Sequence, residues 1–170
     1  PRYVSNLFIF DLDFCLPAKG KEESHQLKMS KPYVNPTVPF KQRVNLEKQK
    51  NYIIKGRPLP DCESFNFNFQ NGQSSDVNDI PFQFLVKFKP RKSIVTWYKK
   101  AGLWSEQTPV YDFLFSINED FITEILVDNT EYTVVVNDRE ITRFKHNMLM
   151  DIVDTFTIEG DLFLTEVQIS

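Results

Sequence analysis

The side chains in this sequence best suited to bind a ligand are its two tryptophans, Trp97 and Trp104. An indole ring has a broad apolar face and a single N–H donor, which suits the C–H face of a sugar or an apolar group of a peptide. The pair is therefore a candidate aromatic platform for a glycan or a peptide. The alternative is a packing role, in which Trp104 stabilises the fold and Trp97 fills the space beside it. The sequence leaves both interpretations open.

Basic residues gather in the same part of the chain. They follow two neighbouring predicted strands and the loop between them, and they are Lys87, Lys89, Arg91, Lys92, Lys99 and Lys100. Such a patch suits sulfated glycans, phosphate groups or an acidic partner. Lysines at the border of a sheet also prevent edge-to-edge aggregation, and we expect this protective role. The net charge of −3 gives no argument for nucleic acid as a partner.

One short motif has the form of a catalytic site. Residues 8–13 are an apolar run that ends in Asp11-x-Asp13. They resemble the phosphatase motif of the haloacid dehalogenases, in which the first aspartate is the nucleophile and the second the general acid. That chemistry needs a parallel sheet with crossover helices, whereas the chain after this motif contains strand patterns and almost no helix. We therefore expect no enzyme activity and interpret the motif as an extra strand or a docking segment.

The sequence gives no support for metal or cofactor chemistry. Neither histidine, His25 or His146, lies at metal-ligand spacing from a cysteine or a carboxylate. We therefore expect neither a bound metal nor a cofactor. Cys15 and Cys62 are far apart in the sequence, which favours two reduced thiols over a disulfide.

The elements that must position these residues are strands. Phe65, Phe67 and Phe69 alternate with asparagines, the period-two pattern of a strand with one buried face. Further runs rich in aromatic and β-branched residues lie at 82–88, 94–98, 113–115, 121–127, 132–136 and 156–169. Turn-forming residues separate these runs, and the one helical pattern, at 148–153, is long enough for a single turn. Short strands at near-regular spacing predict an all-β sandwich or barrel.

Composition indicates one folded domain with an extension. The chain has 170 residues, of which 41% are hydrophobic, 25% are charged and 16 are phenylalanine. We interpret residues 1–36 as an N-terminal extension, with an apolar strand-like segment and a polar linker, and residues 37–170 as the domain. No run is long and apolar enough to span a bilayer. No signal peptide is visible, which predicts a protein that is cytoplasmic or secreted without a signal peptide.

Short motifs along the domain occur in an ordered series. They are Val38-Pro39-Phe40, Tyr52 to Gly56, Ser64 to Phe69, Asp79 to Phe84, Ser93 to Val95, Trp104, Val135 to Asp138, Phe144 to His146 and Phe156 to Leu162. Their order and spacing resemble the galectin carbohydrate-recognition domain, although no single match is specific. The resemblance implies a galectin-like antiparallel β-sandwich of the jelly-roll type, with sugar held on the concave face.

The resemblance also implies which positions face the sugar. The galectin pattern is H-x-N-x-R on one strand, V-x-N on the next and W-x-x-E-x-R on a third. In this chain those positions fall on Gln83, Leu85, Lys87, Trp97, Trp104, Gln107 and a residue near Pro109. Glu106 takes the place of Gln107 if the loop is shortened. An alternative register sets the first motif on Lys87, Lys89 and Arg91; we prefer the first register because it keeps Asp79-Ile80 and Ile94-Val95 aligned.

Of these positions, only Trp104 keeps the residue type of the family. The loss of one buried hydrogen-bond partner costs about 1–3 kcal/mol, whereas millimolar binding amounts to about 4 kcal/mol in total. We therefore predict a galectin-like carbohydrate-binding (lectin) module whose β-galactoside specificity is altered or lost. The alternative is a galectin-fold module for protein–protein interaction or dimerisation that binds no sugar. The candidate partners are accordingly a glycan or glycoconjugate, a protein, or a second copy of the chain.

Overall fold

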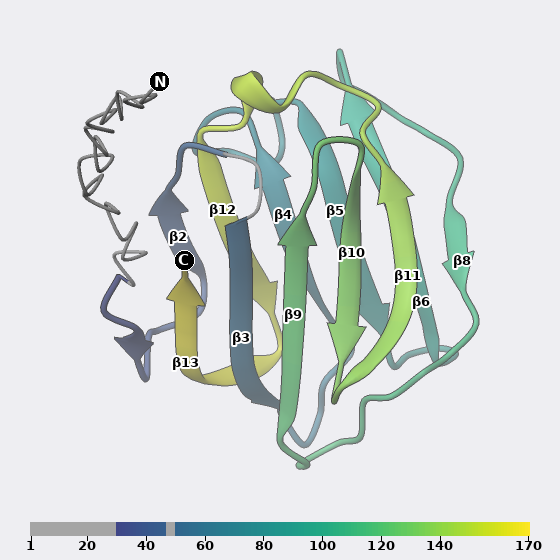
Figure 1. Cartoon of the computed structure of the whole chain (residues 1–170). Helices are drawn as coiled ribbons and strands as arrows, with labels where there is room; N and C mark the ends of the chain where they lie inside the picture. Colours follow the sequence, from purple (N-terminus) through teal and green to yellow (C-terminus); the bar gives the residue numbers. More distant parts are fainter. Residues whose placement is uncertain (1–29, 47–49) are drawn as a thin grey trace, which may run out of the picture.

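The computed structural model describes residues 30–46 and 50–170, which form two antiparallel β-sheets packed face to face (Figure 1). The prediction of an all-β antiparallel sandwich is confirmed. The apolar segment at residues 7–10, the Asp11-x-Asp13 motif, Cys15 and His25 lie outside the described residues.

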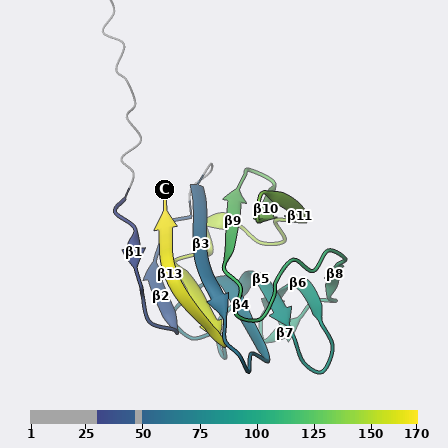
Figure 2. The same ribbon diagram turned by 90° about the horizontal axis from the view of Figure 1, so that it is seen from below.

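One sheet has six strands in the order β1-β13-β3-β9-β10-β11. Its strands are β1 (Tyr33–Val34), β13 (Leu162–Ile169), β3 (Lys50–Pro58), β9 (Phe121–Val127), β10 (Glu131–Val136) and β11 (Arg139–Lys145). Figure 2 shows the short β1 alongside β13 at one side of the molecule. β1 therefore covers part of an edge that would otherwise present unpaired backbone groups.

The second sheet has seven strands, in the order β2-β12-β4-β5-β6-β7, with β8 also paired to β6. Its strands are β2 (Phe40–Arg43), β12 (Thr155–Gly160), β4 (Ser64–Gln70), β5 (Ile80–Lys87), β6 (Ser93–Lys100), β7 (Leu103–Trp104) and β8 (Thr108–Val110). Figure 2 shows β6, β7 and β8 at the side of the molecule opposite β1. Both tryptophans therefore lie toward one border of this sheet.

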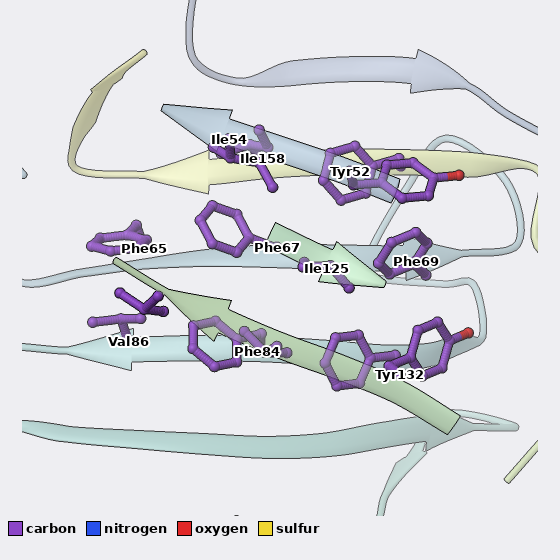
Figure 3. Packing of buried hydrophobic residues seen from close by; sticks show 14 of the residues in the cluster. Tyr52, Ile54, Phe65, Phe67, Phe69, Phe84, Val86, Ile125, Tyr132 and Ile158 are labelled. Carbon is purple, nitrogen blue, oxygen red and sulfur yellow. The ribbon is translucent and has the colours of Figure 1, made fainter. Parts of the chain in front are cut away.

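The core between the sheets is built largely from aromatic rings. Phe65, Phe67 and Phe69 of β4 are fully buried and point toward the six-stranded sheet (Figure 3). Phe67 stacks on Phe84 of β5 with the ring centroids 5.9 Å apart. From the facing sheet, Tyr132 packs on Phe69 with a centroid separation of 5.2 Å. The predicted alternation is thus a core pattern, and it sends the intervening side chains of β4 to the opposite face.

The prediction of a strand at residues 113–115 is wrong, because residues 111–116 have no regular secondary structure. The alternation there has a different cause, since both rings pack on the core from a loop. Phe115 lies edge-on to Phe65 with the centroids 5.3 Å apart. Phe113 lies edge-on to Phe88 at 5.2 Å. Burial of a ring needs no strand pairing, so a short aromatic run identifies core contact better than it identifies a strand.

Within residues 30–46 and 50–170, helical structure is confined to a short segment between β11 and β12. The single turn predicted at 148–153 is confirmed as the 3₁₀ helix η1 (Met150–Ile152). In the ranges that the structure describes, no helix has the length and apolar character needed to cross a bilayer.

The turn between β12 and β13 requires a glycine. Gly160 has a φ of +107°, in the region that side chains disfavour. A Cβ at this position would lie 2.4 Å from the carbonyl oxygen of Ser64. Oδ2 of Asp161 accepts hydrogen bonds from the backbone N–H groups of Glu63 at 2.9 Å and Ser64 at 3.4 Å. The turn is therefore fixed against the start of β4.

Candidate functional site

The outer face of the seven-stranded sheet, turned away from the core, carries the candidate site. The strand register arranges its side chains in rungs across the strands. The central rung consists of Thr157, Asn68, Gln83 and Trp97, on β12, β4, β5 and β6. The terminal rung consists of Ser64, Lys87 and Ser93, at one end of β4, β5 and β6. The structure therefore brings the predicted site residues Gln83, Lys87 and Trp97 to one face.

A chain of side-chain hydrogen bonds follows the central rung. The indole N–H of Trp97 donates to Oε1 of Gln83. Nε2 of Gln83 donates to Oδ1 of Asn68 over 2.9 Å, and Nδ2 of Asn68 donates to Oγ1 of Thr157 over 3.1 Å. The polar side chains of β6, β5, β4 and β12 are thus linked in series across the sheet.

The groups at the two ends of this series of hydrogen bonds fix its direction. Beyond the central rung, Oγ1 of Thr157 lies 3.4 Å from Oε1 of Gln70, and Nε2 of Gln70 donates to the carbonyl oxygen of Gly72 over 2.7 Å. An indole nitrogen can only donate and a carbonyl oxygen can only accept, so each group between them has one orientation. Asn68 and Gln70 are fully buried. The donors and acceptors of the central rung are therefore used within the protein.

Trp97 and Trp104 stack on each other. Their ring centroids lie 4.4 Å apart and the ring planes differ by 25°. The contact follows from the hairpin of β6 and β7, in which Trp104 is paired with Lys99, two residues after Trp97 on the same face. Trp104 remains 40% exposed. One face of Trp104 is thus occupied by Trp97, and the rest of its surface meets solvent.

Lys99 is buried beside this pair. Its side chain is 5% exposed, and Nζ lies 5.9 Å from the ring centroid of Trp104. Nζ donates to the carbonyl oxygens of Ser75 at 2.9 Å and Asp76 at 2.5 Å. These acceptors offset the loss of water around the ammonium group. Lys99 therefore holds the β4–β5 loop (residues 71–79) against β6.

The β4–β5 loop has further anchors on the side of β12. Nζ of Lys41, on β2, donates to the carbonyl oxygen of Gln73 over 3.1 Å. The carboxylate of Asp154 accepts the N–H of Gly72 over 2.6 Å and the hydroxyl of Thr155 over 2.8 Å. The bond from Gly72 is the main cause that lowers the pKa of Asp154 below its ordinary value. The loop is thus fixed to both borders of the outer face.

The basic residues do not form the single patch that the sequence predicts. In the antiparallel hairpin of β5 and β6, Lys87 pairs with Ser93 whereas Lys99 pairs with Ile80, so the two lysines lie at opposite ends of the strands. The ammonium group of Lys99 is bonded to the β4–β5 loop. The exposed Lys100 follows Lys99 at the same end of β6. The prediction of one cluster is wrong because a hairpin separates residues at the far ends of its strands.

Glu106 and Gln107 lie just before β8, and both are exposed. The ladder between β6 and β8 pairs Val95 with Pro109. The same register, continued toward the start of β8, brings Gln107 opposite Trp97. The side chain of Pro109 has no hydrogen-bond donor, so this part of the outer face offers few groups that can bind a sugar hydroxyl.

A separate cavity of about 690 Å³ lies at the end of the sandwich. Its lining residues are Asp79, Lys100, Asn129, His146, Asn147, Met148, Leu149, Met150 and Ile152. Nε2 of His146 lies 2.8 Å from the carbonyl oxygen of Asp128, and the ring lies edge-on to Tyr132 at 4.5 Å. The structure therefore places His146 in contacts that stabilise the fold. Across the described ranges, no group of histidine, cysteine and carboxylate side chains is arranged to hold a metal ion.

Sequence reasoning missed the polar residues that occupy the site from within. The alternation in β4 places Asn68 and Gln70 on the outer face, but nothing in the sequence predicts that both are fully buried there. Thr157 lay in an unremarkable strand pattern. Amides on the outer face of a strand can bond water as readily as protein, so their pattern carries no signal of burial.

Comparison with known proteins identifies the class to which this sandwich belongs. Residues 38–169 match the model of the galactoside-binding lectin family. The chain therefore belongs to the galectin family, and it has the fold of a carbohydrate-binding lectin module. Galectins are generally non-enzymatic.

Individual relatives share the domain at moderate identity. Rat galectin-8 is 28% identical over 129 residues, which cover 74% of this chain and 41% of that protein. Human galectin-4 is 29% identical over 166 residues, covering 90% of this chain and 49% of that protein. The chain thus spans about half or less of the length of these curated relatives.

Solved structures show the same fold. Sheep galectin-11 in complex with glycerol is 28% identical, has a TM-score of 0.71, and is matched over 78% of this chain and 97% of its own. The galectin LEC-6 of Caenorhabditis elegans, 18% identical, has a TM-score of 0.73 over 82% of this chain and 95% of its own. At that identity, the second likeness concerns the fold alone.

Proposed function

We propose that this chain is a carbohydrate-binding module of the galectin family whose β-galactoside specificity is altered or lost. One observation carries the proposal: Trp97 stacks on Trp104 with the ring centroids 4.4 Å apart, and its indole N–H is bonded to Gln83. By the resemblance to the family, all of these residues hold sugar-facing positions. A galactoside in the usual pose would need the surfaces that these contacts occupy.

The stack removes the apolar platform. A tryptophan holds a sugar by packing one ring face against the C–H face of the pyranose. In this chain one face of Trp104 packs on Trp97, so that face is closed to a ligand. A ligand can still reach the exposed remainder of Trp104, but it must approach in another orientation. This supports an altered specificity rather than a conserved one.

The groups that would read hydroxyls are also engaged or missing. Gln83 uses both ends of its amide, accepting from Trp97 and donating to Asn68. To bind a hydroxyl it would have to break a buried hydrogen bond, which costs about 1–3 kcal/mol. Leu85 offers no donor or acceptor at all. We therefore expect affinity for lactose to be weaker than millimolar, since millimolar binding corresponds to only about 4 kcal/mol.

Lactose titration by calorimetry, together with a glycan array, tests the proposal on the chain as it exists. We expect no measurable heat with lactose and binding to a restricted set of other glycans. Lactose binding with a submillimolar dissociation constant would contradict the altered specificity.

A restored variant sharpens the test. It returns the family's residue types at all departing positions, through Gln83→His, Leu85→Asn, Lys87→Arg, Trp97→Asn, Gln107→Glu and Pro109→Arg. We expect this variant to gain lactose binding, and a further Trp104→Ala change to remove it again. Thermal unfolding of each variant separates lost binding from lost structure, and the titration of the unaltered chain stands independently of them.

The second candidate is a protein-interaction or dimerisation module that binds no sugar. The observation behind it is that large apolar side chains are exposed near both ends of β6, where Leu103 is 76% exposed and Tyr111 is 92% exposed. Apolar surface of this kind marks contacts with other proteins when it is contiguous. A stable dimer in sedimentation, combined with an empty glycan array, would favour this candidate over the first.

A further inference from the structure

We infer that residues 7–10 of this chain dock, within the same molecule, in the cavity at the end of the sandwich that carries η1. The cavity has a volume of about 690 Å³, and pockets that hold ligands have volumes of about 300–1,000 Å³. It is separate from the stack of Trp97 on Trp104, and docking there does not require that the chain bind a glycan. Three features point to this occupant: the lining of the cavity, the length of chain between the segment and Ser30, and the charge at the rim.

The loop between β11 and β12 places apolar side chains at the surface. The apolar residues that line the cavity all come from this loop, and they are Met148, Leu149, Met150 and Ile152. Met150 packs against the core, whereas Leu149 is 72% exposed. Contiguous exposed apolar surface is typical of interaction sites, and the unbranched side chain of methionine adapts to the shape of a ligand. The lining therefore suits apolar side chains.

Residues 7–10 supply apolar side chains of the kind that this lining accepts. Their sequence is Leu-Phe-Ile-Phe, the longest uninterrupted apolar run in residues 1–29. Burial of Phe8 and Phe10 would remove a large apolar area from water. Methionine sulfur also makes favourable contacts with aromatic rings. The two phenylalanines therefore match the methionines that line the cavity.

Ser30, where the described residues begin, lies toward the same end of the sandwich as the cavity. Its hydroxyl donates to the carbonyl oxygen of Ile169, at the end of β13. The ladders across β13, β3 and β9 pair Ile169 with Tyr52 and Tyr52 with Ile125. The turn that follows β9 contains Asn129, which lines the cavity. Figure 1 shows this turn and η1, the short coil before β12, at one end of the sandwich.

The chain before Ser30 is long enough to reach the cavity. Neighbouring strands lie about 4.8 Å apart, so the separation of Ser30 and Asn129 is on the order of 20 Å. The roughly twenty residues from Phe10 to Ser30 can extend to about 65 Å. A connection that spans two sites raises the effective concentration of one at the other to the order of millimolar. Docking within one molecule is therefore favoured over docking in a second copy.

A smaller cavity beside Ser30 is nearer but suits an apolar segment less well. Its volume is about 300 Å³, and it is lined by polar and charged groups such as Gln42, Arg43 and Lys50. An apolar ring placed there would displace water from these groups without replacing its hydrogen bonds, which costs free energy. The larger cavity with the methionines is therefore the favoured site.

The rim of the cavity adds a charge that complements the segment. Lys100 lines the cavity and forms no ion pair with any described residue. Asp11 and Asp13 follow the apolar run directly, so docking brings carboxylates toward this ammonium group. The carboxylate of Asp79, also on the rim, accepts the N–H of Ala101 over 2.7 Å. Because an exposed ion pair contributes little, burial of the rings supplies most of the affinity and charge orients the segment.

The test uses the full chain with a nitroxide spin label on Cys15, five residues after Phe10. Cys62 is 1% exposed, so the folded protein takes the label at Cys15. We expect the label to broaden the amide NMR signals of Asn129 and of residues 146–152. Signals of residues 42–45, beside the smaller cavity, and of residues 88–92, in the loop between β5 and β6, should broaden less.

Variants on both partners sharpen the test. The double change Phe8→Ser and Phe10→Ser, and separately Leu149→Ser, should each weaken the broadening at the cavity by at least about threefold. Leu27→Ser is the matched control in the extension, and Leu59→Ser, at a position 42% exposed in the turn after β3, is the matched control on the domain. The amide spectrum of each variant reports whether it folds, and the broadening in the unaltered labelled chain stands without the variants.

A mixture of two samples separates docking within one molecule from docking between molecules. When labelled chain without ¹⁵N is mixed with unlabelled ¹⁵N chain, broadening reports only contacts between copies. We expect none, and broadening of the cavity signals in this mixture would assign the cavity to a second copy and overturn the inference. Broadening centred on residues 42–45, or broadening at the cavity that Leu149→Ser leaves unchanged, would overturn the site. Absent or uniform broadening in the labelled chain would overturn the occupant.

Discussion

The indole N–H of Trp97 donates to Oε1 of Gln83, so two residues at sugar-facing positions bond to each other. Nε2 of Gln83 in turn donates to Oδ1 of Asn68 over 2.9 Å. A site that binds the hydroxyl groups of a sugar must keep its hydrogen-bond donors free until the sugar binds. Here the same atoms hold neighbouring strands together, and this is the physical reason for expecting a changed specificity.

Removal of the indole donor is expected to destabilise the protein. Trp97→Phe keeps an aromatic ring for the stack but leaves Oε1 of Gln83 without its donor. The free energy of unfolding should fall by about 1–3 kcal/mol, as measured by urea denaturation. Trp104→Phe is the control, because it retains the stack and leaves the central rung intact. Equal losses in the two variants would mean that the hydrogen bond adds nothing beyond ring packing.

Replacement of Lys99 by methionine should release the β4–β5 loop. Methionine keeps most of the apolar stem beside Trp104 but has no group to bond the carbonyls of Ser75 and Asp76. We expect faster amide hydrogen exchange at residues 72–78, measured by mass spectrometry. Lys100→Met changes the same charge at the neighbouring exposed position and should leave the exchange of the loop unaltered. Unchanged protection in Lys99→Met would show that the other anchors suffice.

The pH dependence of stability should contain a contribution from Asp154. Its pKa is lowered in the folded state, chiefly by the N–H of Gly72, from an unfolded value of about 3.9. The folded state therefore gains stability from this carboxylate above about pH 4, and loses it as the pH falls through the folded pKa. Asp154→Asn should flatten the curve of unfolding free energy against pH in this acidic window. The exposed Asp151 supplies the control variant Asp151→Asn, and parallel curves for the two variants would contradict the assignment.

Cys62 should react only when the protein opens. The residue is 1% exposed, and burial, assisted by the charge of Asp161, raises the pKa of its thiol to about 11. The reactive thiolate is therefore scarce at pH 8. In a Cys15→Ser background, which leaves a single thiol, modification by Ellman's reagent should follow the rate of unfolding. Rapid modification of the folded protein at pH 8 would be inconsistent with this burial.

Local pattern was sufficient for most strands and for the direction of their side chains. The run from Phe121 to Val127 is β9 with the bounds that the sequence predicts. The alternation around Phe82 and Phe84 places Gln83 and Lys87 on the outer face, as the structure has them. These features depend on the period of a strand, which a sequence displays directly.

Features that depend on distant contacts could not be predicted. Lys99 has the sequence signature of an exposed lysine, and its burial follows from the path of the β4–β5 loop. Asn68 likewise has the pattern of a solvent-facing residue, but its hydrogen-bond partners lie on two other strands, Gln83 on β5 and Thr157 on β12. The stack of Trp97 on Trp104 depends on the hairpin that returns the chain along β6.

The fixed direction of the central rung has a consequence for how this surface can change by mutation. A substitution at Asn68 or Gln83 interrupts a series of buried bonds, so a new residue there must be matched by its neighbours in the same step. A substitution at Lys87 or Ser93 breaks no side-chain hydrogen bond within the described residues. The end of the outer face that carries Lys87 and Ser93 is thus the part where new ligand preferences can accumulate one residue at a time while the fold stays intact.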